Sequence, residues 1–132
     1  MTHPPCDRVV VAFDVPIRPE PWRRAGSNGA RRYMDPKSRA YKKAIADACI
    51  DAMRDQCVKP ATDGDLYLWC LFEKRDARRC DGDNAYKAIA DALNGIAYKD
   101  DRQVVDGRFH TIHRAAVDRV SVAVLRAERG VS

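Results

Sequence analysis

Residues 81–106 read DGDNAYKAIADALNGIAYKDDRQVVD, and no other stretch of the chain carries as clear a structural and chemical pattern. Apolar residues recur at helical spacing from about Asn84 to Leu93. Asp83 is a typical N-cap residue, and Gly95 is typical of the position just after a helix end. The pattern predicts a short helix with an acidic loop at each end.

The acidic loops hold carboxylates that could converge on one cation. Asp81 and Asp83 stand two residues apart, which in extended chain places both side chains on one side. Asp100 and Asp101 follow the helix, and the residues before them are long enough to double back. Carboxylates without Cys or His partners suit a hard divalent cation. Lys87, one helical turn after Asp83, can point its ammonium toward them.

Such a site would hold Mg²⁺, with Mn²⁺ as a substitute, and could activate water for attack on a phosphodiester. The alternative is purely structural. Asp83 would then be only a helix cap, Asp100 and Asp101 would form a solvated turn, and Lys87 would make a weak surface ion pair. The residue types alone leave both interpretations open.

Composition describes an ordinary globular chain. It has 132 residues, 45% of them hydrophobic and 33% charged, which favours a single domain over residues 1–132. The longest apolar run, Leu66 to Phe72, is too short to cross a bilayer, and the N-terminus lacks the pattern of a secretory signal. The five scattered cysteines include no CxxC pair. We therefore expect a cytoplasmic protein with reduced thiols and no membrane partner.

Positive charge is concentrated in one segment. Residues 17–44 carry nine basic and two acidic residues, a formal +7, whereas the whole chain carries +5. Within them, residues 16–34 are rich in Pro, Gly and Arg and are expected to form a long loop. Trp22 and Tyr33 flank its arginines and could stack on bases or fold back onto the core. A nucleic acid is favoured as partner over a merely solvated surface. The candidate DNA-contacting residues are Arg18, Arg23, Arg24, Arg31, Arg32, Lys37 and Lys42.

The remaining segments predict an α+β fold, a mixed sheet of about four strands flanked by two helices. Asp35-Pro36 is a strong helix start, and Asp65–Arg75 is apolar on both faces, which indicates a central strand. The expected elements are a strand at Arg8–Val15, a helix from Pro36 to about Gln56, a strand at Asp65–Arg75, the helix at Asn84–Leu93, and strands at Val104–Arg114 and Arg119–Ala127.

Three motifs within the opening stretch resemble the signature of the RusA family of Holliday-junction resolvases, the crossover junction endodeoxyribonucleases. They are DGDNAYK at 81–87, DALNG at 91–95 and DDRQV at 100–104. The Pro/Arg-rich loop and the helix opening at Asp35-Pro36 resemble the family more weakly, and the order of elements also fits. The resemblance therefore covers most of the chain.

The resemblance implies a RusA-like, homodimeric, Mg²⁺-dependent endonuclease. Such enzymes act on branched DNA and cut four-way junctions by paired symmetric nicks in recombination and repair. It also implies a bacterial cytoplasm, with a phage or prophage as a compatible source. By resemblance, the catalytic residues are Asp81, Asp83, Lys87 and Asp101, with Asp81, Asp83 and Asp101 as metal ligands and Asp100 as a supporting ligand.

Two other hypotheses remain at this point. The protein could keep the fold and the basic surface as a non-catalytic DNA-binding protein, although phosphate binding alone would favour fewer acids than this chain has. It could instead be a small metal-binding or regulatory domain without a nucleic-acid role, which the charge of residues 17–44 argues against.

Overall fold

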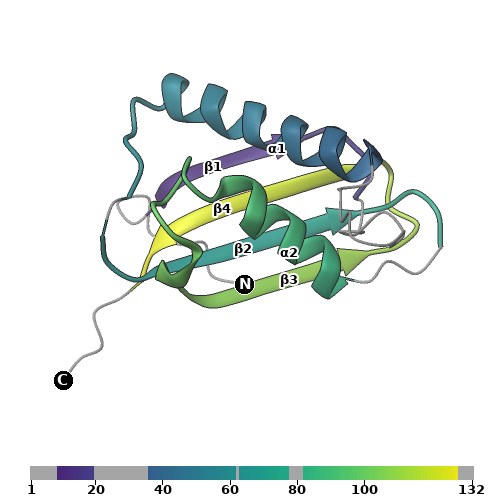
Figure 1. Ribbon diagram of the computed structural model, residues 1–132. Helices are drawn as coiled ribbons and strands as arrows, with labels where there is room; N and C mark the ends of the chain where they lie inside the picture. The colour runs from purple at the N-terminus through teal and green to yellow at the C-terminus, as the bar shows by residue number, and fades with distance from the viewer. Residues whose placement is uncertain (1–8, 20–35, 62, 78–81, 128–132) are drawn as a thin grey trace, which may run out of the picture.

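The computed structural model describes residues 9–19, 36–61, 63–77 and 82–127 (Figure 1). In these ranges a four-stranded sheet carries two helices on one face, which confirms the predicted α+β class. The elements in chain order are β1 (Val9–Val15), α1 (Pro36–Asp55), β2 (Leu66–Glu73), α2 (Gly82–Leu93), the 3-10 turn η2 (Asp101–Gln103), β3 (Val104–Ile112) and β4 (Arg119–Arg126).

The strands of the sheet lie in the order β1-β4-β2-β3. β4 pairs antiparallel with both β1 and β2, and β2 pairs parallel with β3. β2 therefore has a neighbour on each side, as its apolar sequence predicts. A parallel pair needs a crossover connection, and α2 supplies it between β2 and β3.

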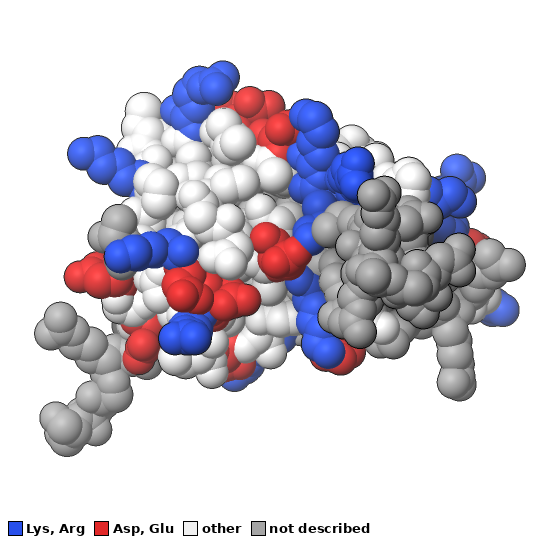
Figure 2. All heavy atoms as spheres, in the orientation of Figure 1, with Lys and Arg blue, Asp and Glu red and all other residues white. Residues whose placement is uncertain are grey.

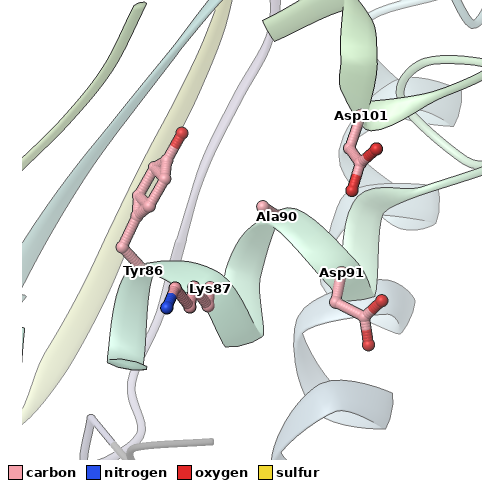
Figure 3. A pocket seen from close by; sticks show the side chains of 5 residues that line it. All are labelled: Tyr86, Lys87, Ala90, Asp91 and Asp101. Atoms are coloured by element: carbon pink, nitrogen blue, oxygen red, sulfur yellow. The ribbon is translucent and has the colours of Figure 1, made fainter. Parts of the chain in front are cut away.

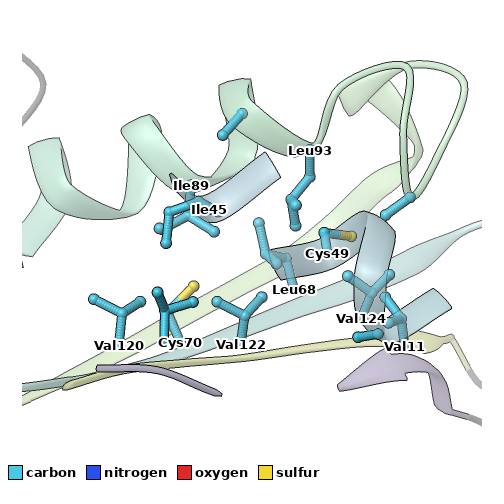
Figure 4. Close-up of a cluster of buried hydrophobic side chains, with 14 of the residues drawn as sticks. Val11, Ile45, Cys49, Leu68, Cys70, Ile89, Leu93, Val120, Val122 and Val124 are labelled. Atoms are coloured by element: carbon cyan, nitrogen blue, oxygen red, sulfur yellow. The ribbon is translucent and has the colours of Figure 1, made fainter. Parts of the chain in front are cut away.

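The core lies between the sheet and the helix layer (Figure 4). α1 packs beside α2 and over β1, while α2 covers β2 and β3 (Figure 1). Alternate residues of β2 and β4 point into this layer, which follows from the two-residue period of a strand. Side chains that are fully or almost fully buried include Val11, Ile45, Cys49, Leu68, Phe72, Ile89, Leu93, Val120 and Val124.

Two glycines let α2 lie close to β3. A Cβ atom at Gly107 of β3 would overlap the ring and hydroxyl of Tyr86, and one at Gly82 of α2 would overlap the ring of Phe109. The two rings themselves are tilted against each other, with centroids 6.0 Å apart. Each element thus presents a glycine to an aromatic ring of the other, which fixes the first turns of α2 on the edge of the sheet.

The start of α2 differs from the prediction, whereas its end agrees. The helix begins at Gly82, so Asp83 lies inside the first turn and the prediction that it is the N-cap was wrong. Glycine is a poor helix former by propensity, but the packing of Gly82 on Phe109 outweighs that preference. Gly95 has φ +81°, as expected for the residue that follows a helix end.

The chain then turns back along α2. The Tyr98 hydroxyl is buried beneath the helix and donates a 2.6 Å hydrogen bond to the Ala90 carbonyl. Main-chain bonds join Ala97 and Lys99 to Ala61, which anchors this return to the segment after α1. The doubling back predicted before Asp100 is therefore present, and it brings η2 beside α2 (Figure 1).

Among the described residues, none of the helices has both the length and the apolar character needed to cross a bilayer.

Candidate functional site

A hollow of about 290 Å³ lies along α2 (Figure 3). Its lining residues are Tyr86, Lys87, Ala90 and Asp91 from the helix and Asp101 from η2. A lysine and a carboxylate predicted from the sequence as catalytic therefore line one depression, although fourteen positions separate them in the chain.

Asp83 is connected to this hollow through Lys87. The Lys87 ammonium lies 3.3 Å from an Asp83 carboxylate oxygen, one helical turn away, as the spacing predicted. Both side chains are about two-thirds exposed. An exposed pair of this kind contributes at most about 1 kcal/mol to stability, so it holds the lysine loosely and leaves it free to contact a ligand.

Asp100 and Asp101 have different roles although they are adjacent. Asp100 is the N-cap of η2, and its carboxylate accepts a 3.0 Å hydrogen bond from the Arg102 N–H. The Gln103 side chain accepts in return from the Asp100 N–H, which completes a capping box. The Arg102 N–H and the adjacent Asp101 side chain hold the pKa of Asp100 below its usual range. The cap fixes the turn that presents Asp101 to the hollow.

Gln103 ties this turn to the rest of the fold. Its amide donates to the Ala61 and Gly64 carbonyls at 3.3 and 3.2 Å. The position of Asp101 thus depends on a contact that reaches across to the segment between α1 and β2.

Tyr86 is a lining residue that sequence reasoning missed. Burial raises the pKa of its hydroxyl to about 12, and the nearby Asp106 and Asp101 carboxylates add to the shift. The hydroxyl is therefore a permanent hydrogen-bond donor at neutral pH. The available signal was the three-residue spacing from Asp83, which places Tyr86 on the same side of the helix.

Asp91, also missed as a site residue, joins the two helices. Its carboxylate forms an ion pair with the Lys42 ammonium of α1, and only 13% of the Lys42 side chain is exposed. Burial lowers the pKa of Lys42. Lys42, predicted to contact DNA, is thus held within the helix layer by the hollow's own aspartate.

Other predicted DNA-contacting residues lie near the start of α1. Lys37 is exposed in the first turn, and Arg18, just after β1, forms a 2.7 Å ion pair with Asp76. Basic side chains gather at the end of the helix layer where α1 begins (Figure 2). Four predicted DNA contacts, one predicted catalytic aspartate and the two loop aromatics lie outside the described residues: Arg23, Arg24, Arg31, Arg32, Asp81, Trp22 and Tyr33.

The donor chemistry at the hollow fits a hard cation. Within the described ranges no three His, Cys, Asp or Glu side chains cluster closely enough to form a metal site by themselves. Asp83 nevertheless pairs with Lys87, Asp101 lines the same hollow as that lysine, and both aspartates offer only oxygen ligands.

Comparison with known proteins identifies the family. No curated protein matches the chain in a direct sequence search. The family model described as Endodeoxyribonuclease RusA matches residues 14–125. The match includes every element from α1 to β3, nearly all of β4 and the last two residues of β1, as well as the hollow with its lysine and aspartates. The chain therefore belongs to the RusA family of endodeoxyribonucleases.

Proposed function

We propose that this endodeoxyribonuclease is a Mg²⁺-dependent enzyme that resolves four-way DNA junctions by paired symmetric nicks. The observation that carries the proposal is the shared hollow of Lys87 and Asp101, with Asp83 bound to the same lysine, in a RusA-family chain. A cationic and an anionic group facing one depression is an arrangement that suits phosphodiester hydrolysis.

In this proposal Asp81, Asp83 and Asp101 hold the metal, and Asp100 is a supporting ligand that also fixes the turn carrying Asp101. Mn²⁺ can replace Mg²⁺ because both take carboxylate oxygens. When bound, the metal supplies Lewis-acid activation of water and neutralises charge at the phosphate. It would also offset the mutual repulsion of the carboxylates.

The remaining lining residues act on the phosphate and its surroundings. Lys87 turns from Asp83 toward a non-bridging phosphate oxygen, which its exposure permits. The Tyr86 hydroxyl, which is protonated at neutral pH, can donate a further hydrogen bond to an anionic oxygen. Asp91 positions the helix by its ion pair with α1 and has no proposed contact with the reacting atoms.

DNA would reach the hollow along the positive end of the helix layer. The contacts proposed are those of residues 16–34 and of α1, namely Arg18, Arg23, Arg24, Arg31, Arg32, Lys37 and Lys42. Lys42 contributes positive charge to this surface while it stays paired with Asp91, whereas Lys37 is free to contact phosphate directly. We place the enzyme in a bacterial cytoplasm, with a host, phage or prophage origin. It would act as a homodimer, because two symmetric cuts need two identical sites.

The test is incubation of the purified chain with a mobile four-way junction and a matched linear duplex, in Mg²⁺ or in EDTA. We expect paired nicks confined to the junction and dependent on Mg²⁺. Tight junction binding with no cleavage in either Mg²⁺ or Mn²⁺ would favour a non-catalytic DNA-binding protein instead.

A matched pair of variants assigns the cleavage to this hollow. Asp83→Asn should abolish nicking and leave junction binding intact or tighter, because a repulsive carboxylate near phosphate is lost. Asp47→Asn is the control, because Asp47 pairs with Lys43 on α1 at the same i,i+4 spacing. Equal loss of nicking in both folded variants would remove the hollow from the proposed mechanism.

A further inference from the structure

The Gln103 side chain uses every hydrogen bond that it can make. Its amide oxygen accepts from the Lys99 N–H at 2.9 Å and from the Asp100 N–H at 3.0 Å. Its amide nitrogen donates to the Ala61 carbonyl at 3.3 Å and to the Gly64 carbonyl at 3.2 Å. A glutamine amide has two hydrogens to donate and two lone pairs that accept, so its capacity is fully used. One side chain therefore both closes the turn η2 and ties it to the segment between α1 and β2.

The chain on either side of η2 is held without Gln103. Before the turn, main-chain hydrogen bonds of 2.9 and 3.1 Å join the returning chain to Ala61. After the turn, Val104 begins the parallel pairing of β3 with β2. Asp101 lies between these two anchors and is exposed. Loss of the bonds of Gln103 should therefore loosen the turn that carries Asp101 and leave the rest of the fold in place.

We propose that Gln103 is a positioning residue for the divalent cation, because it holds the turn from which Asp101 binds the ion. In this proposal Gln103 contacts neither the cation nor the phosphate, and it sets the cation affinity through Asp101. Replacing a residue that orients a metal ligand typically weakens metal binding about 10–100-fold. The inference rests on the proposed function, since it takes Asp101 as a ligand. It deepens that function by naming what determines the affinity for the ion.

Gln103→Glu separates the two parts of this arrangement. A carboxylate can still accept hydrogen bonds from the N–H groups of the turn, but it has no hydrogen to donate to the two carbonyls and repels them. The closed turn is kept and its tie to the fold is lost. The substitution also adds a negative charge close to Asp101, which by itself would attract a cation. Weaker cation binding by this variant can therefore not result from the added charge.

Gln56→Glu is the matched control. The Gln56 amide donates a 2.8 Å hydrogen bond to the Ala12 carbonyl, 44 positions away in the chain. This bond connects the residue after α1 with β1, and β1 and β3 form opposite edges of the sheet. The two variants make the same chemical change and each deprives main-chain carbonyl groups of a donor. They differ in whether the lost bond holds the turn of Asp101.

The first test is titration of the full chain with Mn²⁺ in the absence of DNA, with the free ion measured by electron paramagnetic resonance. Gln103→Glu should raise the dissociation constant about tenfold or more, and Gln56→Glu should change it by less than about twofold. The number of sites per chain should stay the same, because partial unfolding would remove sites and would not weaken those that remain. Equal dissociation constants for the two folded variants would overturn the proposal.

Amide hydrogen exchange without metal measures the turn itself. The Arg102 N–H donates to the Asp100 carboxylate at 3.0 Å, and it should exchange about tenfold faster in Gln103→Glu. The Ala61 N–H donates to the Ala97 carbonyl at 2.9 Å, and its exchange should not change. Unchanged exchange at Arg102 would overturn the proposal, because the turn would then be fixed without Gln103.

Nicking of the four-way junction distinguishes this inference from the proposed function. Gln103→Glu should need about tenfold more Mg²⁺ for half-maximal nicking and should approach the wild-type rate at saturating Mg²⁺, because the ligands themselves are intact. A wild-type chain that binds Mn²⁺ and cuts, with both variants alike, would overturn this inference alone. A wild-type chain that binds Mn²⁺ without cutting would overturn the proposed function, and the expected shift in Mn²⁺ affinity would still support this inference. A wild-type chain that neither binds nor cuts would overturn both.

Discussion

The two edges of the sheet differ in how completely the helices cover them. β1 lies under α1, and its Val11 and Val15 are at most 6% exposed. No residue of β3 is fully buried, although α2 lies over it. The tightly packed side provides stability, while the lightly packed side holds the hollow and the exposed strand. Substitutions on the two sides should therefore differ in whether they lower stability or activity.

The largest expected loss of stability is at the α1 side. Ile45→Ala should lower the free energy of unfolding by about 2–5 kcal/mol, because it leaves a cavity around a fully buried position. Ile50→Ala on the same helix is the control, since Ile50 is 42% exposed, and should change stability by less than about 0.5 kcal/mol. Urea denaturation measures both, and similar losses would contradict the difference between buried and exposed faces.

A smaller loss is expected where α2 meets β3. Gly107→Ala should cost about 1–3 kcal/mol, because its new methyl group overlaps the Tyr86 ring. Replacing the ring as well, in a Gly107→Ala/Tyr86→Leu variant, should make the combined loss smaller than the sum of the two single losses. Additive losses would mean that the ring has room to move aside.

The ion pair between the helices should respond unequally to loss of its two partners. Asp91→Ala leaves the largely buried Lys42 ammonium unpaired and should cost about 1–3 kcal/mol. Lys42→Met leaves an aspartate that is about half exposed and can be hydrated, so it should cost less. Equal unfolding free energies for the two variants would show that burial of the lysine does not determine the cost of breaking this ion pair.

Substitution of Lys87 should have the smallest effect on stability and the largest effect on DNA cleavage. Lys87→Gln removes an exposed charge and should change the free energy of unfolding by less than about 0.5 kcal/mol. Junction cleavage should fall by about a hundredfold or more, since a donor to the transition state is lost. Lys59→Gln, also exposed, is the control for charge alone. Normal cleavage by the folded Lys87 variant would exclude the lysine from catalysis.

The sequence correctly predicted those elements in which hydrophobic patterning and the residues at the element ends indicate the same structure. The apolar run of β2 correctly gave its interior position, and Gly95 correctly marked the end of α2. The start of α2 was missed because residue propensities place Gly82 outside the helix and Asp83 at its cap. In the fold, tertiary packing at Gly82 sets the start of the helix instead. Local signals cannot show a ring from a distant strand filling the space above a glycine.

The site was predictable as a set of residues and less so as an arrangement. Lys87 and Asp101 were named from motif and spacing, and they line one hollow. Asp100 caps a turn, whereas Asp101 faces the hollow. This division depends on the hydrogen bond from Gln103 to the Ala61 carbonyl, which joins residues 42 positions apart. Proposed roles for all of these residues in catalysis remain predictions for the experiments above.

The strand order also bears on how the protein is made. β4 comes after the other three strands of the described sheet in the sequence, yet it occupies an interior place between β1 and β2. During synthesis β1 and the β2–α2–β3 unit emerge first, and they cannot form one sheet until residues 119–126 have left the ribosome. The sheet beneath the hollow would then be complete only after residues 119–126 are made, so a nascent chain that stops before them should lack nuclease activity.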